Sequence, residues 1–240
     1  MTPTIKEWIH PQYGRCVTIS AGPVTALVTI ERGPRILSYS FSEGENILYT
    51  EALPQKQTGF LSMGGHRVAL SPEQENSYYP DNEPVTYTIL ENGVGFTAPR
   101  QKSSGLQFSM DLLFNEKTAD MMIVHTLKNH SKERIHAGIW SITMLLPEGT
   151  LLLPQNTAPG DETAPSRILA FWPGSSPKDH RFHLGENDQY IRVDVLCENR
   201  PFTMGINNQP GWAGYSKRKN TLLQRNVHNQ GRWDPNHRWS

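Results

Sequence analysis

Short apolar runs separated by turn residues dominate the first part of the chain. Residues 16–19 form such a run, residues 24–30 follow after a Gly-Pro turn, and residues 36–41 come after a second one. Each run is rich in Val, Ile, Thr or Tyr and is bounded by Gly and Pro, which is typical of β-strands. A helix would require the apolar spacing to continue for ten or more residues, and here it stops sooner. We therefore expect these runs to be strands.

The same pattern continues towards the C-terminus. Residues 85–90 and 94–98 flank the turn sequence Glu-Asn-Gly, which predicts a hairpin. Longer apolar runs with polar turns predict a meander of three strands, at 106–114, 121–127 and 135–146. A passage rich in Pro and Gly follows at 147–177, interrupted by the run 167–172, and further strands are expected at 190–196, 202–206 and 212–215.

Strands do not alternate with helical patterns anywhere in the chain, so a parallel α/β sheet is disfavoured. The sequence contains neither an internal repeat of fixed period nor a low-complexity linker. We predict an all-β protein with antiparallel sheets packed as a sandwich, forming a single domain over residues 1–240 with a divergent tail at 226–240.

Composition narrows the choice of partners. Hydrophobic residues make up 36% of the chain and charged residues 19%, as in a soluble globular protein. Because 23 basic residues balance 23 acidic ones, neither nucleic acid nor an anionic membrane is an expected partner. Without an apolar run of signal-peptide or membrane-spanning length, a cytoplasmic location is expected. One disulfide between Cys16 and Cys197 is arithmetically possible, but we expect two free thiols.

The densest group of chemically capable residues begins at the GGHR sequence, residues 64–67, which we interpret as part of an ordered loop. His66 offers an acid or base near neutral pH, and Arg67 offers a fork of hydrogen-bond donors. The alternative is that the glycines form a turn and that Arg67 forms an ion pair that fixes the loop. The downstream candidates are Glu73, Tyr79, Asp81 and Asn82.

Histidines and tryptophans supply further candidates. His125 lies in the predicted strand 121–127, on the face opposite Val124 and Thr126. Its spacing from the two following histidines matches no familiar ligand pattern, so we expect a polar residue that lines the sandwich and no metal. Trp140 is either a platform for a sugar ring or a core residue. A second acid–histidine group, ranked lower, consists of Asp179, His180 and His183.

The segment GGHRVALSPEQENSYYPDNEPV, residues 64–85, resembles a branch of the galactose mutarotase-like superfamily that is related to aldose 1-epimerases. The similarity continues along the chain to about residue 225. It implies an antiparallel β-supersandwich with a sugar-binding cleft on a concave sheet. Further matching landmarks are the sequences NILY at 46–49, KNHS at 128–131, WSIT at 140–143, FWP at 171–173, PFTMG at 201–205 and WAGY at 212–215.

The resemblance implies a carbohydrate ligand and proton transfer without a cofactor. Mutarotation requires an acid that protonates the ring oxygen and a base that takes the proton of the anomeric hydroxyl. The residues that we assign to this catalysis are His66, Glu73 and Asp81. The residues that we assign to sugar binding are Arg67, Asn82, Tyr79, His125 and Trp140.

The chain also departs from the pattern of aldose 1-epimerases. In those enzymes one strand carries the histidine that acts as the acid, and the strand that resembles it here holds Trp140 and Ser141. The glutamate that those enzymes carry late in the chain has no counterpart. We therefore expect the sandwich to lack its last strands. Two alternatives to the epimerase remain: a non-catalytic sugar-binding or structural protein, and a metal-dependent lyase or hydrolase that uses His66 and His125.

Overall fold

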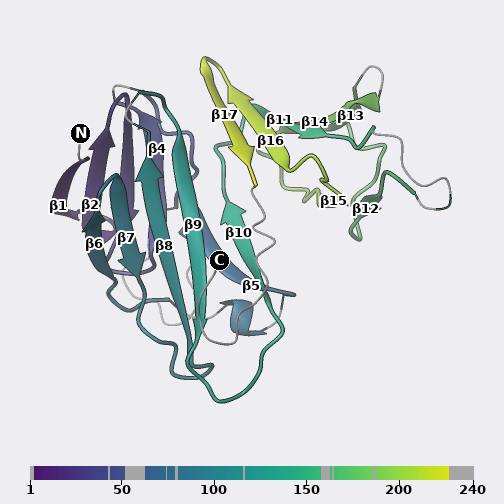
Figure 1. Cartoon of the computed structure of the whole chain (residues 1–240). Coiled ribbons are helices and arrows are strands. Elements are labelled where there is room, and N and C mark those ends of the chain that lie inside the picture. The colour runs from purple at the N-terminus through teal and green to yellow at the C-terminus, as the bar shows by residue number, and fades with distance from the viewer. Residues whose placement is uncertain are drawn as a thin grey trace. The chain divides into compact units, whose positions relative to one another are not determined.

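Strands dominate the computed structural model of the chain (Figure 1). All the pairings among its strands are antiparallel, and within the described residues the only helix is the 3₁₀ turn η1, Glu75–Tyr78. These features confirm the prediction of an all-β protein with several antiparallel sheets. None of the described helices is long and apolar enough to cross a membrane. The structure describes residues 3–42, 44–51, 63–73, 75–78, 81–115, 117–157, 163, 165–185 and 188–226.

Contacts along the chain divide it into two compact units, Met1–Leu146 and Pro147–Ser240. The boundary lies at the start of the passage rich in Pro and Gly. The single domain over residues 1–240 stays a prediction. Each unit is described separately below.

The first unit contains two antiparallel sheets. The six-stranded sheet has the order β1 (Thr4–His10), β2 (Gly14–Ala21), β3 (Val24–Thr29), β4 (Arg35–Phe41), β5 (His66–Ser71) and β10 (Gly138–Thr143). The four-stranded sheet has the order β6 (Thr86–Leu90), β7 (Gly93–Thr97), β8 (Leu106–Phe114) and β9 (Met121–Asn129).

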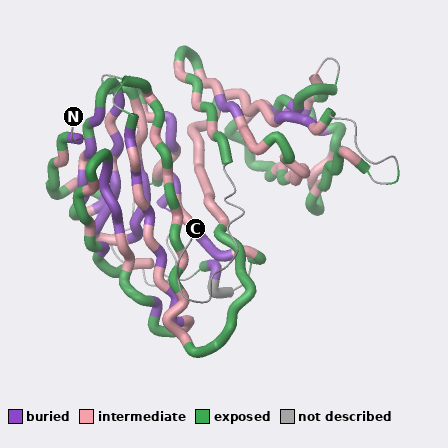
Figure 2. Tube along the Cα trace, viewed as in Figure 1, coloured by how far each residue is buried: buried purple, intermediate pink, exposed green. Residues whose placement is uncertain are grey.

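Residues that alternate along the strands form the core of the first unit. In β8 every second residue is buried, from Leu106 to Phe114 (Figure 2). Leu70 of β5 joins Leu106 and Phe108 of β8 in one apolar cluster, with Val68 packed against it. The two sheets therefore face each other across an apolar layer, as in a β-sandwich.

The prediction that the GGHR sequence lies in a loop is wrong, because His66 begins strand β5 (His66–Ser71). The two glycines before it have φ values of 73° and 69°, and a Cβ atom on Gly65 would lie 2.1 Å from the carbonyl oxygen of Ile36. Only glycine allows this approach, which brings β5 beside β4 at the pair Ile36–His66.

The predicted three-stranded meander is also wrong in its last strand. β8 and β9 pair along their whole length, as expected. β10, however, leaves the four-stranded sheet and pairs with β5 in the other one, with Thr143 opposite His66. A polar turn between apolar runs indicates that the chain changes direction, but it does not say which strand will be the partner.

The second unit contains a five-stranded sheet and a two-stranded one. Its core gathers Phe182, Ile191 and Val193, with Phe171 and Phe202 packed against them. The five strands have the order β13 (Phe182–Leu184), β14 (Tyr190–Val195), β11 (Gly149–Pro154), β16 (Trp212–Lys217) and β17 (Asn220–Arg225). The two-stranded sheet consists of β12 (Leu169–Phe171) and β15 (Met204–Ile206).

Both cysteines are free, as the sequence predicted. Cys16 is buried in β2, where burial raises the pKa of its thiol to about 11, and Cys197 is exposed. At neutral pH the Cys16 thiol is therefore protonated and acts as a small apolar side chain.

Truncation of a core leucine tests the packing of the sandwich. Leu112 is fully buried in β8, whereas Ile89 in β6 is 58% exposed. Leu112→Ala should lower the free energy of unfolding by about 2–5 kcal/mol, because it leaves a cavity. Ile89→Ala should change it by less than about 0.5 kcal/mol. Urea unfolding followed by tryptophan fluorescence measures both, and equal losses would contradict the assignment of inward and outward faces.

Candidate functional site

Two histidines meet between the sheets of the first unit. His66 opens β5 and is only 5% exposed, and His125 lies on β9 of the opposite sheet. Their Nε2 atoms are 2.9 Å apart, while the ring centroids are 5.1 Å apart and the ring planes differ by 18°. The short distance between the two nitrogens is that of an N–H···N hydrogen bond. His125 alternates in exposure with Val124 and Thr126, as predicted.

Thr143 continues the contact on the far side of His66. The antiparallel register of β10 and β5 places Thr143 opposite His66, and its hydroxyl Oγ1 lies 2.8 Å from Nδ1 of His66. Both nitrogens of His66 are therefore engaged. Thr143, His66 and His125 form a hydrogen-bonded chain across three strands.

Burial keeps both imidazoles neutral. It lowers the pKa of His66 to about 3, with a further contribution from the neighbouring His125, and lowers the pKa of His125 to about 4. Nδ1 of His125 is buried and has no hydrogen-bond partner in the described part of the chain. The pair thus carries no charge at neutral pH, and one of its four ring nitrogens, Nδ1 of His125, makes no hydrogen bond within the described residues.

Arg35, Arg67 and Asp81 form a second polar group. Arg35 is fully buried in β4, and its Nη2 lies 2.7 Å from Oδ1 of Asp81. The N–H of Gly33 also donates to the carbonyl of Asp81, at 2.9 Å. Since Ile36 is opposite His66, the same register places Arg35 opposite Arg67. Burial lowers the pKa of Arg67 and the nearby Arg35 lowers it further, while Asp81 raises it.

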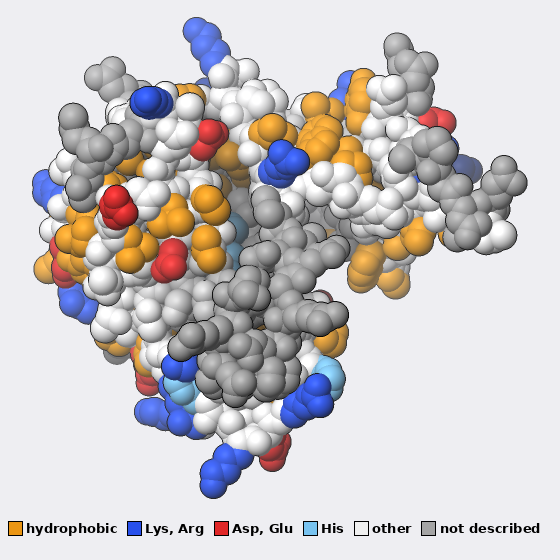
Figure 3. All heavy atoms as spheres, viewed as in Figure 1, with side chains coloured by type: hydrophobic (Ala, Val, Ile, Leu, Met, Phe, Trp, Pro, Cys, Tyr) orange, Lys and Arg blue, Asp and Glu red, His pale blue; other side chains and the backbone are white. Residues whose placement is uncertain are grey.

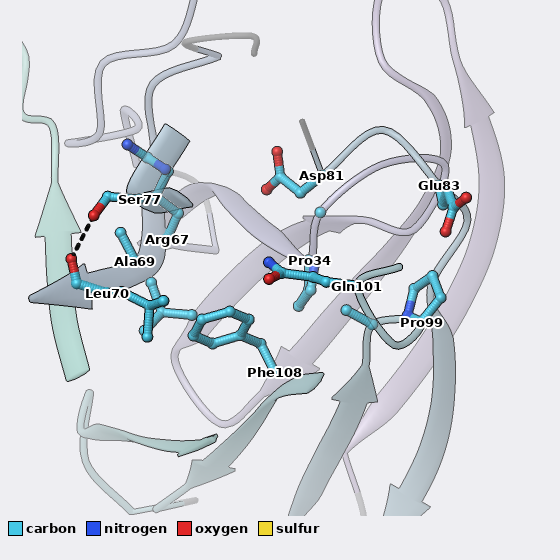
Figure 4. A pocket seen from close by; sticks show the side chains of 13 residues that line it. Pro34, Arg67, Ala69, Leu70, Ser77, Asp81, Glu83, Pro99, Gln101 and Phe108 are labelled. Atoms are coloured by element: carbon cyan, nitrogen blue, oxygen red, sulfur yellow. Dashed lines mark hydrogen bonds between the residues drawn. The ribbon is translucent and has the colours of Figure 1, made fainter. Parts of the chain in front are cut away.

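A hollow lies beside β5 next to this polar group. Figure 4 shows Arg67 and Leu70 on one side of it, Glu83 and Pro99 on the other, and Asp81 between them. Its enclosed part has a volume of about 50 Å³, counted as space for the centres of water molecules, so it holds only a few waters. The remaining lining residues are Gly33, Pro34, Val68, Ala69, Ser77, Ala98, Gln101 and Phe108.

Glu73 and Trp140, two further predicted site residues, do not line this hollow. Glu73 is exposed, and its carboxylate accepts a hydrogen bond from the hydroxyl of Tyr78. Trp140 pairs with Ala69, so it lies on the opposite side of its sheet from His66. Asn82 is half-buried next to Asp81, and Tyr79 lies outside the described residues.

The three predicted catalytic residues have different neighbours. His66 bonds to Thr143 and His125, Glu73 bonds to Tyr78, and Asp81 bonds to Arg35. Of the three, Asp81 belongs to the lining of the hollow. Of the predicted sugar-binding residues, Arg67 joins Asp81 there, and His125 joins His66.

The described residues do not provide a set of ligands for a metal ion. The described part of the chain contains no group of three or more His, Cys, Asp or Glu side chains arranged around one ion. His66 and His125 point at each other, and His130 instead approaches Oε1 of Gln107 at 2.9 Å.

The second acid–histidine group is divided between different contacts. The carboxylate of Asp179 accepts two hydrogen bonds of 2.8 Å from the Arg181 guanidinium. These bonds hold the pKa of Asp179 well below its usual range. Nδ1 of the exposed His180 lies 3.7 Å from Oδ1 of Asp179, whereas its Nε2 lies only 2.8 Å from the carboxylate of Glu198. Nε2 of His183 lies 2.9 Å from the carboxylate of Asp194. Asp179, His180 and His183 therefore do not form one site.

Sequence reasoning missed Arg35, Thr143 and Gln101. Arg35 directly follows a Gly-Pro turn and opens an apolar strand, where a charged residue is unusual and could have served as a signal. Thr143 and Gln101 carry no such signal, because their positions in the site depend on strand pairing and loop packing.

Comparison with known proteins gives no family assignment. No protein-family model and no curated protein matches the chain. A solved structure of a TPR-domain containing protein from Parabacteroides distasonis ATCC 8503 aligns with 84% of this chain and 45% of its own, with 15% identity and a TM-score of 0.47. The structure of HI1317 aligns with 90% of this chain and 76% of its own, with 12% identity and a TM-score of 0.40. The chain thus spans less than half the length of the first of these proteins.

The neutral histidine pair predicts an acid-sensitive stability. In the unfolded chain both imidazoles regain a pKa of about 6.5, so below that pH the unfolded state binds more protons than the folded state. The free energy of unfolding should be highest above pH 6.5 and fall as the pH is lowered from 6.5 towards 4, by up to about 1.4 kcal/mol per pH unit for each histidine.

Urea unfolding at several pH values measures this slope. The double variant His66→Gln with His125→Gln should flatten it between pH 6.5 and 4, whereas His136→Gln, which changes an exposed histidine, should leave it unchanged. An unaltered slope in the double variant would contradict the assignment.

The buried guanidinium of Arg35 predicts a second stability effect. Asp81→Asn removes the charge that faces Arg35 and should lower the free energy of unfolding by about 1.5–3 kcal/mol, as for hydrogen bonds to charged groups. Glu83→Gln alters an exposed ion pair with Lys102 and should cost at most about 1 kcal/mol. Thermal or urea unfolding compares the two variants, and an equal effect would show that Arg35 does not depend on Asp81.

Proposed function

We propose that the protein binds a carbohydrate at the hollow beside β5, in keeping with the resemblance to the galactose mutarotase-like superfamily. The observation that supports this most strongly is the meeting of Arg67, Asp81 and Gln101 with Phe108 and Leu70 around one hollow. These residues come from four separate segments of the chain.

Their chemistry suits a sugar. A guanidinium, a carboxylate and an amide can donate to and accept from neighbouring hydroxyls, while an aromatic ring and an aliphatic side chain suit the C–H face of a pyranose. Pockets that enclose a small molecule usually measure about 300–1,000 Å³, far more than the enclosed part of this hollow. We therefore expect one edge of the sugar to enter while the rest stays in solvent, with weak binding.

Surface charge supports a neutral ligand over a polyanion. On the described part of the face in Figure 3, acidic and basic side chains are scattered among each other without a continuous basic stripe. This agrees with the equal numbers of basic and acidic residues in the chain. A small uncharged sugar needs no long-range electrostatic attraction.

Proton transfer of the aldose 1-epimerase type is the second candidate, and the His66–His125 pair favours it. Two neutral imidazoles in contact can accept and release protons. The pair does not belong to the lining of the hollow, however, and His66 is engaged through both nitrogens. We therefore favour binding without turnover.

Ligand-observed NMR with saturation transfer tests the binding, using glucose, galactose and mannose as probes. Arg67→Met and Gln101→Leu should each remove most of the transfer, because they delete polar contacts to hydroxyls. Lys102→Met is the matched control: its side chain is 87% exposed, and the change should leave the signal intact. Transfer that persists in both hollow variants would place the sugar elsewhere, and no transfer in the wild type would overturn the proposal for these sugars.

Exchange spectroscopy on the same samples separates the two candidates. Interconversion of the α and β anomers at the rate seen in buffer would support binding alone. Faster exchange that is lost in His66→Gln would instead establish the epimerase reaction.

A further inference from the structure

The chain of Thr143, His66 and His125 has a property that none of the three residues has alone. Each neutral imidazole carries one N–H and one bare nitrogen. At 2.9 Å the two facing Nε2 atoms must be one donor and one acceptor, since two N–H groups would repel and two bare nitrogens would leave both unsatisfied. The tautomer of one ring therefore fixes the tautomer of the other.

Only two arrangements satisfy this contact. In the first, Nε2–H of His66 donates to His125, so the Thr143 hydroxyl donates to the bare Nδ1 of His66 and Nδ1 of His125 carries a hydrogen. In the second, Nε2–H of His125 donates to His66, Nδ1–H of His66 donates to the Thr143 oxygen, and Nδ1 of His125 is bare. Conversion of the second into the first takes one proton in at Nδ1 of His125 and sends one out through the Thr143 hydroxyl, with no change in net charge.

The surroundings of these three hydrogen-bonded side chains keep the two imidazoles uncharged and leave Nδ1 of His125 without a hydrogen-bond partner among the described residues. His66 is almost wholly buried, and Nδ1 of His125 is buried without a partner in the described part of the chain. On β9, the neighbours of His125 on the same face are Ile123 and Leu127, and on β5 the next inward residue is Val68. An apolar setting of this kind strengthens the N–H···N contact and discourages a charged ring.

We propose that Thr143, His66 and His125 act as a tautomer relay, in which the hydrogen bond made by the Thr143 hydroxyl decides whether the open Nδ1 of His125 is a donor or an acceptor. Thr143 is then a positioning residue that acts on His125 through His66, across the space between the two sheets. The relay goes beyond the proposed sugar binding and does not depend on it.

Nitrogen-15 NMR of histidine-labelled protein at pH 7.5 tests the relay directly. In the wild type, one of the two rings should be protonated at Nε2 and the other at Nδ1, and a coupling across the hydrogen bond should connect the two Nε2 nuclei. Identical tautomers in both rings, or no such coupling in a folded sample, would overturn the proposal.

Variants of Thr143 test the transmission. Thr143→Val should shift the ring-nitrogen resonances of both His66 and His125, and Thr143→Ser should restore them. Ser141→Ala is the matched control, since Ser141 lies two residues earlier on the same strand face, and His130 provides an unaffected reference within each sample. A shift confined to His66 would mean that the rings are independent. If Thr143→Val does not fold, the Nε2–Nε2 coupling in the wild type still decides the question.

Discussion

Strand β5 places both parts of the candidate site, and its own position depends on the two glycines before it. Their left-handed backbone lets the chain come against the carbonyls of Ile36 and Tyr49, where no side chain would fit. β5 can then pair with β4 on one side and β10 on the other. Because neighbouring residues in a strand point to opposite faces, His66 enters the space between the sheets and Arg67 lies opposite Arg35.

Burial gives these two groups different chemical character. Between the sheets, desolvation favours neutral imidazoles, which can exchange a proton but do not attract a charged ligand. Beside the hollow, the carboxylate of Asp81 lies against the guanidinium of the buried Arg35 and forms an ion pair with it. One strand thus presents a neutral hydrogen-bonded group on one side and a charged cluster on the other.

The second unit supplies its own polar contacts. Arg181 satisfies Asp179 through two charged hydrogen bonds and lies over the ring of Phe202, 5.3 Å from its centroid. This arrangement joins a loop to the apolar core, so Asp179 has a structural role. An acid and a histidine that are adjacent in sequence therefore need not form a site together.

Sequence alone determined the all-β class, most strands, the 86–97 hairpin and the inward face of His125, because period-two patterns and turn residues are local signals. It also identified His66, Arg67 and Asp81 as polar residues in an unusual setting. Only the tertiary structure decided that His66 starts a strand, that β10 pairs with β5, and that Thr143 and Arg35 complete the two groups. Those outcomes depend on which strands pair and in what register, and residues 77 positions apart carry no local signal of their contact.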